Sequence, residues 1–378
     1  MYKVSIVILL FVTGLINAQI VDIPDENFKS ALVNDPVADL GDNTWGDVDT
    51  NNDGEIQVSE AEAVQKLHIN SLLIDSIIGI NSFTNIIELV CAYNNLNEID
   101  VSENLNLKVL NLLDNNLNDL DISANLSIEY LDFAHNNLSE IDLSLTTNLK
   151  KLFCDHNQLN DLDISQNYDL DLLAAQFNNI SQLNLNQNPN LINVDLSHNF
   201  LQNIDLSQNI NLSSIACENN LFETIDISQN QNLILLWCRN NSLLESLNLK
   251  NGFNENFVDM LLEDNINLFC IEVDDVDYAN QSFWHKDPWA EYSEDCSLGI
   301  NENDLTKIIL YPNPVNDVLY IDSTFEIKAI TVYDILGRVL LIQENNLNSI
   351  DVSNLMSNLL LVEVESDKGT VIKKITKE

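Results

Sequence analysis

The chain has 378 residues, which is enough for two or three domains of ordinary size. Acidic residues outnumber basic ones 59 to 16, and the formal net charge of −43 repels phosphate backbones and anionic lipid headgroups, so nucleic-acid binding is excluded. Only 9 Gly and 6 Pro are present, too few for a low-complexity linker protein.

The N-terminus has the layout of a secretory signal peptide. Lys3 precedes the apolar run 4–16, and Ala18-Gln19 offers a small-residue cleavage point. The run holds 13 residues, fewer than the ~20 needed to span a bilayer, so the mature chain is predicted to lack a transmembrane span. We expect residues 1–18 to be removed and the remainder to be exported. The alternative is a buried N-terminal helix or strand.

An acidic segment near the N-terminus resembles an EF-hand calcium loop. Residues 49–60 match the pattern D-x-[DN]-x-[DN]-G-x5-E at every position, with glycine where the loop must turn sharply. The resemblance implies a structural calcium ion. Its ligands would be the side chains of Asp49, Asn51 and Asp53, the carbonyl of Glu55, a water on Gln57 and both carboxylate oxygens of Glu60. The alternative is an acidic surface turn that binds nothing.

Short helices are expected on both sides of this loop. Residues 24–32 have the pattern of an amphipathic helix that covers the open end of a core. Ser59 and Glu62 form a capping box for a helix that runs to about Leu67. Residues 19–66 are therefore predicted to form a helical N-terminal cap that contains the calcium loop.

Asparagine recurs every 21 residues through the middle of the chain. In each unit, aliphatic residues stand eight and five positions earlier, as Leu107 and Leu110 do before Asn115. The frame L-x-x-L-x-L-x-x-N-x-L resembles the leucine-rich repeat. The recurring residues are Asn94, Asn115, Asn136, Asn157, Asn178, Asn199, Asn220 and Asn241.

The resemblance implies a mainly β solenoid in which each unit adds one short strand to a parallel sheet, about 4.8 Å from the next strand. Apolar positions point inward, and each asparagine amide can bond to the backbone of adjacent coils. Because 21 residues leave little room for a helix, the second half of each unit is expected to be extended or turn-like. We predict this leucine-rich repeat solenoid over residues 67–249.

The six cysteines divide into two groups. Residues 250–296 resemble the disulfide-closed cap that follows secreted leucine-rich repeats, and compartment and position assign a bond between Cys270 and Cys296. The other four share one inward position and are expected to stay free as small buried hydrophobes. They are Cys91, Cys154, Cys217 and Cys238. A bond between Cys217 and Cys238, on adjacent coils, remains an alternative.

Composition changes in the last part of the chain. Residues 297–306 are polar and are predicted to form a linker, whereas 307–378 alternate apolar and polar residues, which indicates a C-terminal antiparallel β-sandwich. The segments 311–315, 333–338 and 369–377 resemble the C-terminal sorting domain of the type IX secretion system, found in Bacteroidetes. The resemblance implies export through the type IX machinery, by way of the periplasm, to the outer-membrane surface or the medium. The alternative is an adhesive β-sandwich without a sorting role.

Outward positions on the concave face of the solenoid carry the candidate ligand face. Exposed rings beside polar groups suit binding of a protein or glycan, so a secreted or cell-surface binding and adhesion protein is predicted. The candidate residues are Tyr130, Phe153, Phe177, Trp237, His135, His156 and Arg239. The alternatives are scattered surface side chains without one ligand, and a passive structural protein of the cell surface.

Nothing in the sequence indicates catalysis. It lacks the motifs of serine hydrolases, zinc proteases and phosphate-binding loops, so the chain is predicted not to be an enzyme; a surface hydrolase that uses the acidic face is a weaker alternative. His135 and His156 stand on adjacent coils near Asp114 and Asp155, an arrangement that can hold a transition metal, although exposed polar residues on a repeat face are far commoner than ligands. We expect a monomer.

Overall fold

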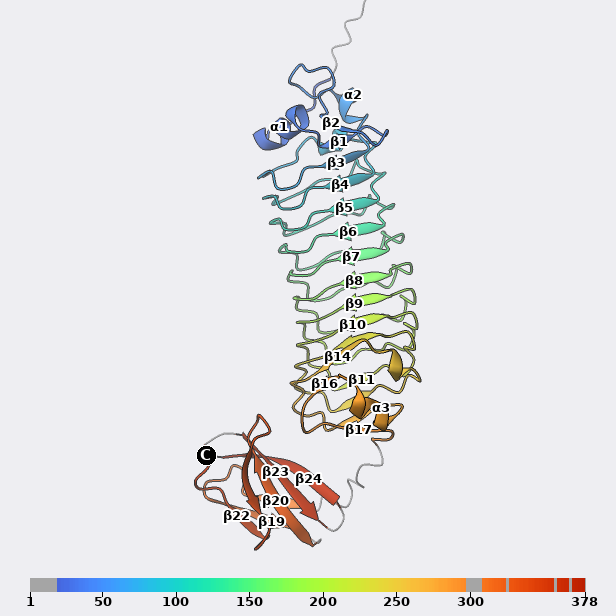
Figure 1. Ribbon diagram of the computed structural model, residues 1–378. Coiled ribbons are helices and arrows are strands. Elements are labelled where there is room, and N and C mark those ends of the chain that lie inside the picture. The colour runs from blue at the N-terminus through green and yellow to red at the C-terminus, as the bar shows by residue number, and fades with distance from the viewer. Residues whose placement is uncertain (1–18, 297–307, 324–325, 357–358, 367–368, 378) are drawn as a thin grey trace, which may run out of the picture. The chain divides into compact units, whose positions relative to one another are not determined.

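The computed structural model describes residues 19–296, 308–323, 326–356, 359–366 and 369–377 (Figure 1). The predicted signal peptide, 1–18, and the predicted linker, 297–306, lie outside these residues. The chain divides into two compact units, Met1–Asn179 and Ile180–Glu378, and each is taken separately. Among the described residues, no helix combines the length and the apolar character needed to cross a membrane.

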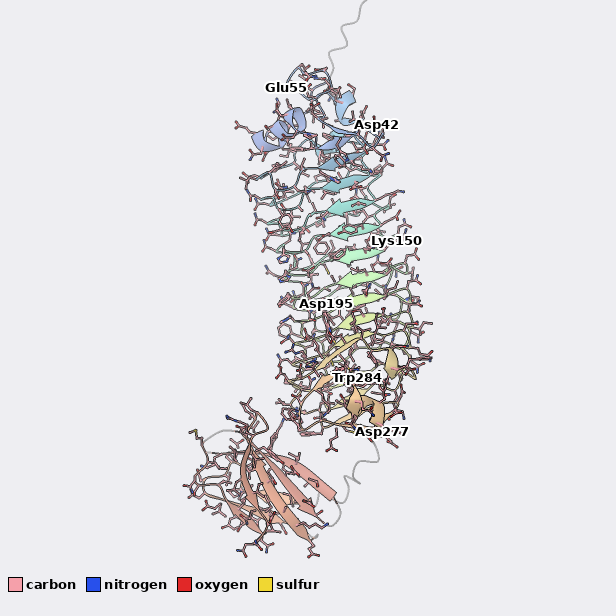
Figure 2. All side chains as sticks on the ribbon, in the orientation of Figure 1. Asp42, Glu55, Lys150, Asp195, Asp277 and Trp284 are labelled. Carbon is pink, nitrogen blue, oxygen red and sulfur yellow. A yellow bond between two sulfur atoms is a disulfide. The ribbon has the colours of Figure 1, made fainter. Side chains whose placement is uncertain are left out.

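Helix α1 (Glu26–Asn34) opens the N-terminal cap, close to the predicted position. Asp25 caps the helix by accepting a hydrogen bond from the Phe28 amide at 2.9 Å. The helix buries one apolar face that includes Phe28 and Leu32. Lys29, on the same helix, forms an ion pair at 2.6 Å with Glu55 of the acidic loop, and Glu55 is labelled at this end of the unit in Figure 2.

The helix predicted after the acidic loop is wrong in length. Helix α2 spans only Val58–Ala61, and its capping box joins Gln57 to Glu60 rather than Ser59 to Glu62. Strand β3 (Lys66–His68) follows soon after and pairs with the next coil, so tertiary pairing ends the helix early. The remaining strands of the cap, β1 (Ala38–Asp39) and β2 (Trp45–Gly46), pair antiparallel with each other, and β1 also pairs with β3.

The first unit forms the predicted solenoid, with one short strand in each coil. Neighbouring strands pair in parallel, with Leu110 opposite Leu131 and Leu131 opposite Leu152, and these central leucines are fully buried. The stacked leucines form a continuous core through the coils. The further elements of this unit are the 3-10 turn η1 (Ile80–Ser82) and strands β4 (Glu88–Val90), β5 (Val109–Asn111), β6 (Tyr130–Asp132), β7 (Lys151–Phe153) and β8 (Leu172–Ala174).

Buried asparagines tie each coil of the first unit to its neighbour. The Asn136 amide nitrogen donates to the carbonyls of Leu112 and Phe133, both at 3.0 Å, and its oxygen accepts from the Leu117 amide at 2.9 Å. The bond from the Leu117 amide satisfies a buried backbone donor, and the two carbonyls are shared with Asn115 and Asn157, so each amide joins adjacent coils as predicted. Equivalent bonds are made by the other members of this asparagine ladder, Asn94, Asn115, Asn157 and Asn178.

The second half of each repeat is extended or turn-like, as predicted. Asp121 begins it with a turn in which its carboxylate accepts from the Ser123 amide at 2.9 Å. Asn125 then donates to the carbonyls of Val101 and Asn104 in the preceding coil, at 2.9 and 3.0 Å. A second row of asparagines therefore joins the coils on this side.

In the second unit, parallel pairing continues past residue 249, the predicted end of the repeats. β12 (Leu235–Trp237) pairs with β14 (Asp259–Leu262), and β14 pairs with β16 (His285–Lys286). The spacing widens here, since Leu236 lies opposite Met260, and a fixed period of 21 misses these coils. The first strands of this sheet are β9 (Asn193–Asp195) and β10 (Ser214–Ala216).

A second parallel sheet forms in the same unit, in the order β11-β13-β15-β17. Its strands are β11 (Thr224–Asp226), β13 (Ser246–Asn248), β15 (Cys270–Glu272) and β17 (Glu291–Ser293). The 3-10 turn η2 (Asn254–Asn256) and helix α3 (Val276–Gln281) lie between them in the chain. The segment predicted as a separate cap is therefore built partly from further solenoid coils.

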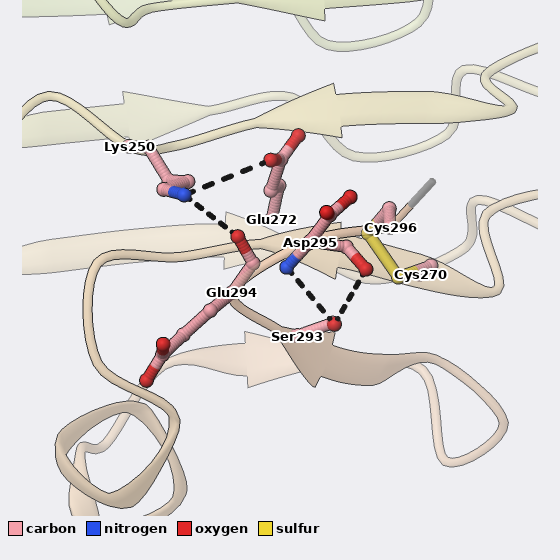
Figure 3. Close-up of a disulfide and its surroundings, with 7 residues drawn as sticks. All are labelled: Lys250, Cys270, Glu272, Ser293, Glu294, Asp295 and Cys296. Carbon is pink, nitrogen blue, oxygen red and sulfur yellow. Dashed lines mark hydrogen bonds and ion pairs between the residues drawn. A yellow bond between two sulfur atoms is a disulfide. The ribbon is translucent and has the colours of Figure 1, made fainter. Parts of the chain in front are cut away.

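The predicted disulfide between Cys270 and Cys296 is formed (Figure 3). It joins β15 to the chain just after β17, across a sequence separation of 26 residues. Beside it, the Lys250 ammonium donates to the Glu294 carbonyl at 2.7 Å and lies 3.9 Å from the Glu272 carboxylate. The bond and this ion pair both hold the end of the second sheet.

The other four cysteines are free and buried, as predicted. Burial raises the pKa of the Cys91 and Cys238 thiols to about 12 and raises that of Cys154 and Cys217 as well. The thiols therefore stay protonated and act as small apolar side chains.

The predicted C-terminal antiparallel sheets are present. Two sheets, ordered β18-β19-β22 and β21-β20-β23-β24, contribute to one core that includes Leu319, Val332 and Val362. Their strands are β18 (Ile309–Tyr311), β19 (Val318–Asp322), β20 (Ile327–Tyr333), β21 (Val339–Gln343), β22 (Ser349–Asp351), β23 (Leu359–Ser366) and β24 (Gly369–Thr376).

Candidate functional site

One residue in each regular coil of the first unit has a left-handed backbone, immediately before the ladder asparagine. The φ values lie between 50° and 57°, a backbone region that residues other than glycine rarely adopt. The His135 amide donates to the Asp155 carbonyl of the next coil at 2.9 Å, and the His156 amide donates to the Gln176 carbonyl at 3.0 Å. These residues form what we call the exposed column: Tyr93, Asp114, His135, His156 and Phe177.

Rings of the exposed column stack on one another. The His135 and His156 ring centroids are 4.0 Å apart with an interplanar angle of 13°, and those of His156 and Phe177 are 4.3 Å apart. On the neighbouring strand positions, Tyr130 of β6 and Phe153 of β7 approach to 5.4 Å between centroids. The predicted ligand-face residues of this unit therefore form two ring clusters.

Two carboxylates lie against these rings. Asp132 and Asp155 are only 6% and 8% exposed. One Asp155 oxygen lies 2.9 Å from His156 Nδ1 and 3.8 Å from His135 Nε2. The Tyr130 hydroxyl lies 3.5 Å from Asp132 and donates to it. The site thus combines aromatic rings, imidazoles and shielded carboxylates.

Burial raises the pKa of Asp132 to about 6, and the neighbouring charge of Asp155 adds to the increase. Hydrogen bonds from the Ala134 amide at 3.1 Å and from the Tyr130 hydroxyl act in the opposite direction, but burial outweighs them. Burial and the Asp132 carboxylate raise the pKa of Tyr130 to about 12, so its hydroxyl remains a hydrogen-bond donor at neutral pH.

Side chains from both ring clusters and both shielded carboxylates line a shallow hollow of about 480 Å³. Its lining includes Tyr93, Asp114, Asp132, His135, Phe153 and Asp155. The volume is within the usual range for small ligands, and the mixed lining can receive a polar ligand through ring contacts and hydrogen bonds.

Trp237 and Arg239, the other predicted ligand-face residues, belong to the second unit and make separate contacts. The Trp237 ring nitrogen donates to Asp259 at 2.9 Å. Arg239 Nε lies 3.4 Å from Glu263 and 3.9 Å from Glu218. Both side chains therefore contact acidic residues of adjacent coils in the second unit.

Asp132 is a site residue that the sequence prediction missed. It stands opposite Phe153 in the parallel register, at a strand position whose side chain leaves the core. Alternation within the strand predicts that direction, but the shielding of its carboxylate depends on side chains from other coils. The period alone therefore does not single it out among the many acidic residues.

The acidic loop 49–60 turns around the buried carboxylate of Asp49, whose oxygens accept from the amides of Asp53 at 3.1 Å and Gly54 at 2.8 Å. Gly54 has a φ of 84°, the conformation that the glycine position of the pattern requires. At the other end, Glu60 accepts from the Thr50 hydroxyl and the Gln57 amide with its two oxygens.

Three of the oxygen atoms predicted to bind calcium lie around the side-chain nitrogen of Gln57. The Gln57 side-chain nitrogen contacts both carboxylate oxygens of Asp53, at 3.2 and 3.1 Å, and the Glu55 carbonyl at 3.2 Å. The backbone bond from Glu55 lowers the pKa of Asp53, and the Gln57 bond adds to this, so the carboxylate stays charged. The loop thus gathers oxygen atoms of the kind that calcium prefers.

Comparison with known families assigns the C-terminal part of the chain. Residues 309–378 match the family described as secretion system C-terminal sorting domain. The match agrees with the resemblance seen in the three C-terminal segments and supports export to the cell surface or the medium. Comparison with curated proteins gives no match for the chain.

Several solved leucine-rich repeat structures are similar to this chain. An internalin of Listeria monocytogenes, InlF, is 17% identical over 73% of this chain and 96% of its own, with a TM-score of 0.47. The functional domain of InlJ from the same organism is 21% identical over 95% and 98%, with a TM-score of 0.34. A leucine-rich repeat protein of Leptospira interrogans is 20% identical over 63% of both chains, with a TM-score of 0.46.

Proposed function

We propose that the protein is an exported surface protein that binds a protein or glycan ligand through the ring clusters of its first unit. The observation that carries the proposal is the grouping of Tyr130 with Phe153, and of His135, His156 and Phe177, around two shielded carboxylates. Rings that stay outside the core offer contact area with little loss of side-chain freedom, and the carboxylates offer directional hydrogen bonds. The sorting-domain match supports presentation on the cell surface or in the medium.

Removing rings from this face should weaken binding. The whole chain would be tested against arrays of polysaccharides and of surface proteins, and the Tyr130→Ala/Phe153→Ala variant against any ligand found. We expect a loss of affinity of about tenfold or more, because aromatic residues at an interface centre contribute most of the binding free energy. Equilibrium binding to the immobilised ligand measures the effect.

Leu105→Ala/Leu126→Ala is the matched control for this experiment. Both leucines are apolar and about half exposed, at 55% and 52%, and both lie outside the strands. The control variant should bind as the wild type does. Equal losses in the two variants would contradict the assigned face, and the absence of any ligand on either array would favour a passive structural protein.

We also propose that loop 49–60 binds a structural calcium ion through Asp49, Asn51, Asp53, Glu55, Gln57 and Glu60. The converging oxygens at Gln57 and the turn of Gly54 support this. Because α1 is linked to the loop through Lys29 and Glu55, an ion here would stabilise the end of the solenoid rather than transmit a signal.

Calcium is therefore expected to raise the stability of the wild-type chain. At about 2 mM calcium and a dissociation constant of about 0.5 mM, the gain is about 1 kcal/mol. Asp53→Asn should lose this gain, because it removes a charged ligand while keeping the oxygen that accepts from the Glu55 amide. Asp42→Asn, an exposed carboxylate outside the loop, should keep it. Thermal unfolding with and without chelator measures the shift, and equal responses of the two variants would refute the site.

A further inference from the structure

Two imidazoles and one carboxylate meet on the exposed column. His135 Nε2 lies 3.8 Å, and His156 Nδ1 lies 2.9 Å, from the same oxygen of Asp155. One ligand atom from each residue lies within 4.8 Å of the other two. Among the residues that the structure describes, this is the group of three histidine, cysteine or acidic side chains with the proximity needed to hold a metal ion.

We propose that His135, Asp155 and His156 form a binding site for a divalent transition cation such as Zn²⁺. Imidazole nitrogen and carboxylate oxygen are ligands that Zn²⁺ favours, with bonds of about 2.0–2.2 Å. In a tetrahedral site such bonds place neighbouring ligand atoms about 3.3 Å apart. The separations of 2.9 and 3.8 Å from the Asp155 oxygen fall on either side of that value, so rotations of the side chains alone can bring the three atoms around one ion.

The backbone around the site is fixed, and the required movement lies in the side chains. The two histidines have φ values of 54° and 50°, and the bond from the His135 amide to the Asp155 carbonyl holds adjacent coils in register. The parallel rings must tilt out of their stack, because lone pairs in parallel planes do not meet at one point. The His135 and His156 side chains are 48% and 38% exposed, which leaves room for this movement.

The fourth position of the ion is left open. Three protein ligands hold a tetrahedral zinc ion, and water or a donor atom of a bound ligand completes it. His135 and Asp155 also line the hollow beside Phe153, so the open position lies at the hollow. The ion would act as a Lewis acid on this face and accept an electron pair from a bound ligand, which the side chains themselves do not do. The proposal rests on the three residues alone and does not depend on the proposed recognition function.

Titration of the untagged chain with ZnCl₂ tests the site, with about 2 mM calcium present to occupy the acidic loop. We expect one saturable site per chain by calorimetry, and CoCl₂ should give the visible absorption of tetrahedral Co²⁺ with nitrogen and oxygen ligands. His135→Asn and His156→Asn should each lower the affinity by about tenfold or more, since each removes a direct ligand.

Asparagine is the suitable replacement because Asn219 and Asn240 hold the same left-handed backbone, with φ values of 55° and 54°. Asp155→Asn provides a further variant that changes no backbone preference and should also lose the site. His285→Asn is the control, since His285 is an exposed histidine 3.2 Å from the carboxylate of Glu263. The proposal fails if no saturable site appears, if the column variants bind like the wild type, or if the control loses as much affinity as they do.

Discussion

Replacing Asn136 with alanine is expected to destabilise the first unit by about 2–4 kcal/mol. The side chain is buried, and its nitrogen donates to the carbonyls of Leu112, Phe133 and Ala134 while its oxygen accepts from the Leu117 amide. Alanine leaves the buried Leu117 amide without its acceptor, and an unsatisfied group of this kind costs about 1–3 kcal/mol before relaxation. It also removes one of two donors from each of the three carbonyls, which keep their bonds from Asn115, Asn157 and the Asp114 amide. Urea unfolding followed by circular dichroism measures the change in unfolding free energy.

The adjacent residue provides the control. Asn137 is exposed, and its backbone amide bonds to the Leu117 carbonyl at 2.8 Å, a bond that alanine retains. Asn137→Ala should therefore change the unfolding free energy by less than about 0.5 kcal/mol. If both variants unfold at the same urea concentration as the wild type, the ladder bonds do not stabilise the solenoid and this explanation of the repeat is wrong.

The solenoid is predictable from sequence because each coil repeats the same residue types at the same positions, leucine in the core and asparagine at the turn after the strand. Leu110, Leu131 and Leu152 stack in register, and the asparagine ladder bonds across coils at the predicted spacing. The prediction is wrong where spacing changes, since a fixed period ends the repeat before β14. Helix α2 is overestimated for a related reason, because capping signals are local whereas pairing of β3 with the next coil is tertiary.

The candidate site is predictable only in part. The period places His135 and His156 on adjacent coils, and their rings do stack. The two ring clusters also need a parallel register, which brings Tyr130 beside Phe153. The burial of Asp132 depends on neighbouring coils, and a single repeat does not contain that information. Carboxylates are common throughout this acidic chain, so only the structure distinguishes the shielded one from the rest.

The buried carboxyl of Asp132 is expected to make the folded chain less stable at neutral pH. Burial raises its pKa from the ordinary value of 3.8 to about 6, so the folded chain holds this proton more tightly than the unfolded chain does. As pH rises from about 4 to about 6, the unfolded carboxyl ionises first, and the folded state loses stability relative to it. The loss persists at neutral pH, where the carboxylate is charged in both states.

Asp132→Asn should therefore gain stability relative to the wild type as pH rises. Between about pH 5 and about pH 7.5, the difference in unfolding free energy should move by about 1.5 kcal/mol in favour of the variant, measured by urea unfolding in chelator. In the wild type, the Asn111 side chain donates to Asp132 at 3.2 Å. The altered contact in the variant changes the unfolding free energy by the same amount at both pH values.

Asp142→Asn supplies the opposite case, because hydrogen bonds from Ser144 lower the pKa of that exposed carboxyl and its replacement should bring no such gain. A difference between Asp132→Asn and the wild type that stays constant with pH would show that Asp132 ionises without penalty. If the gain is observed, Asp132 lowers stability at neutral pH, and a buried carboxylate of that kind is typical of residues kept for binding or chemistry. Asp132 is then the first carboxylate of the hollow to replace once a ligand is identified.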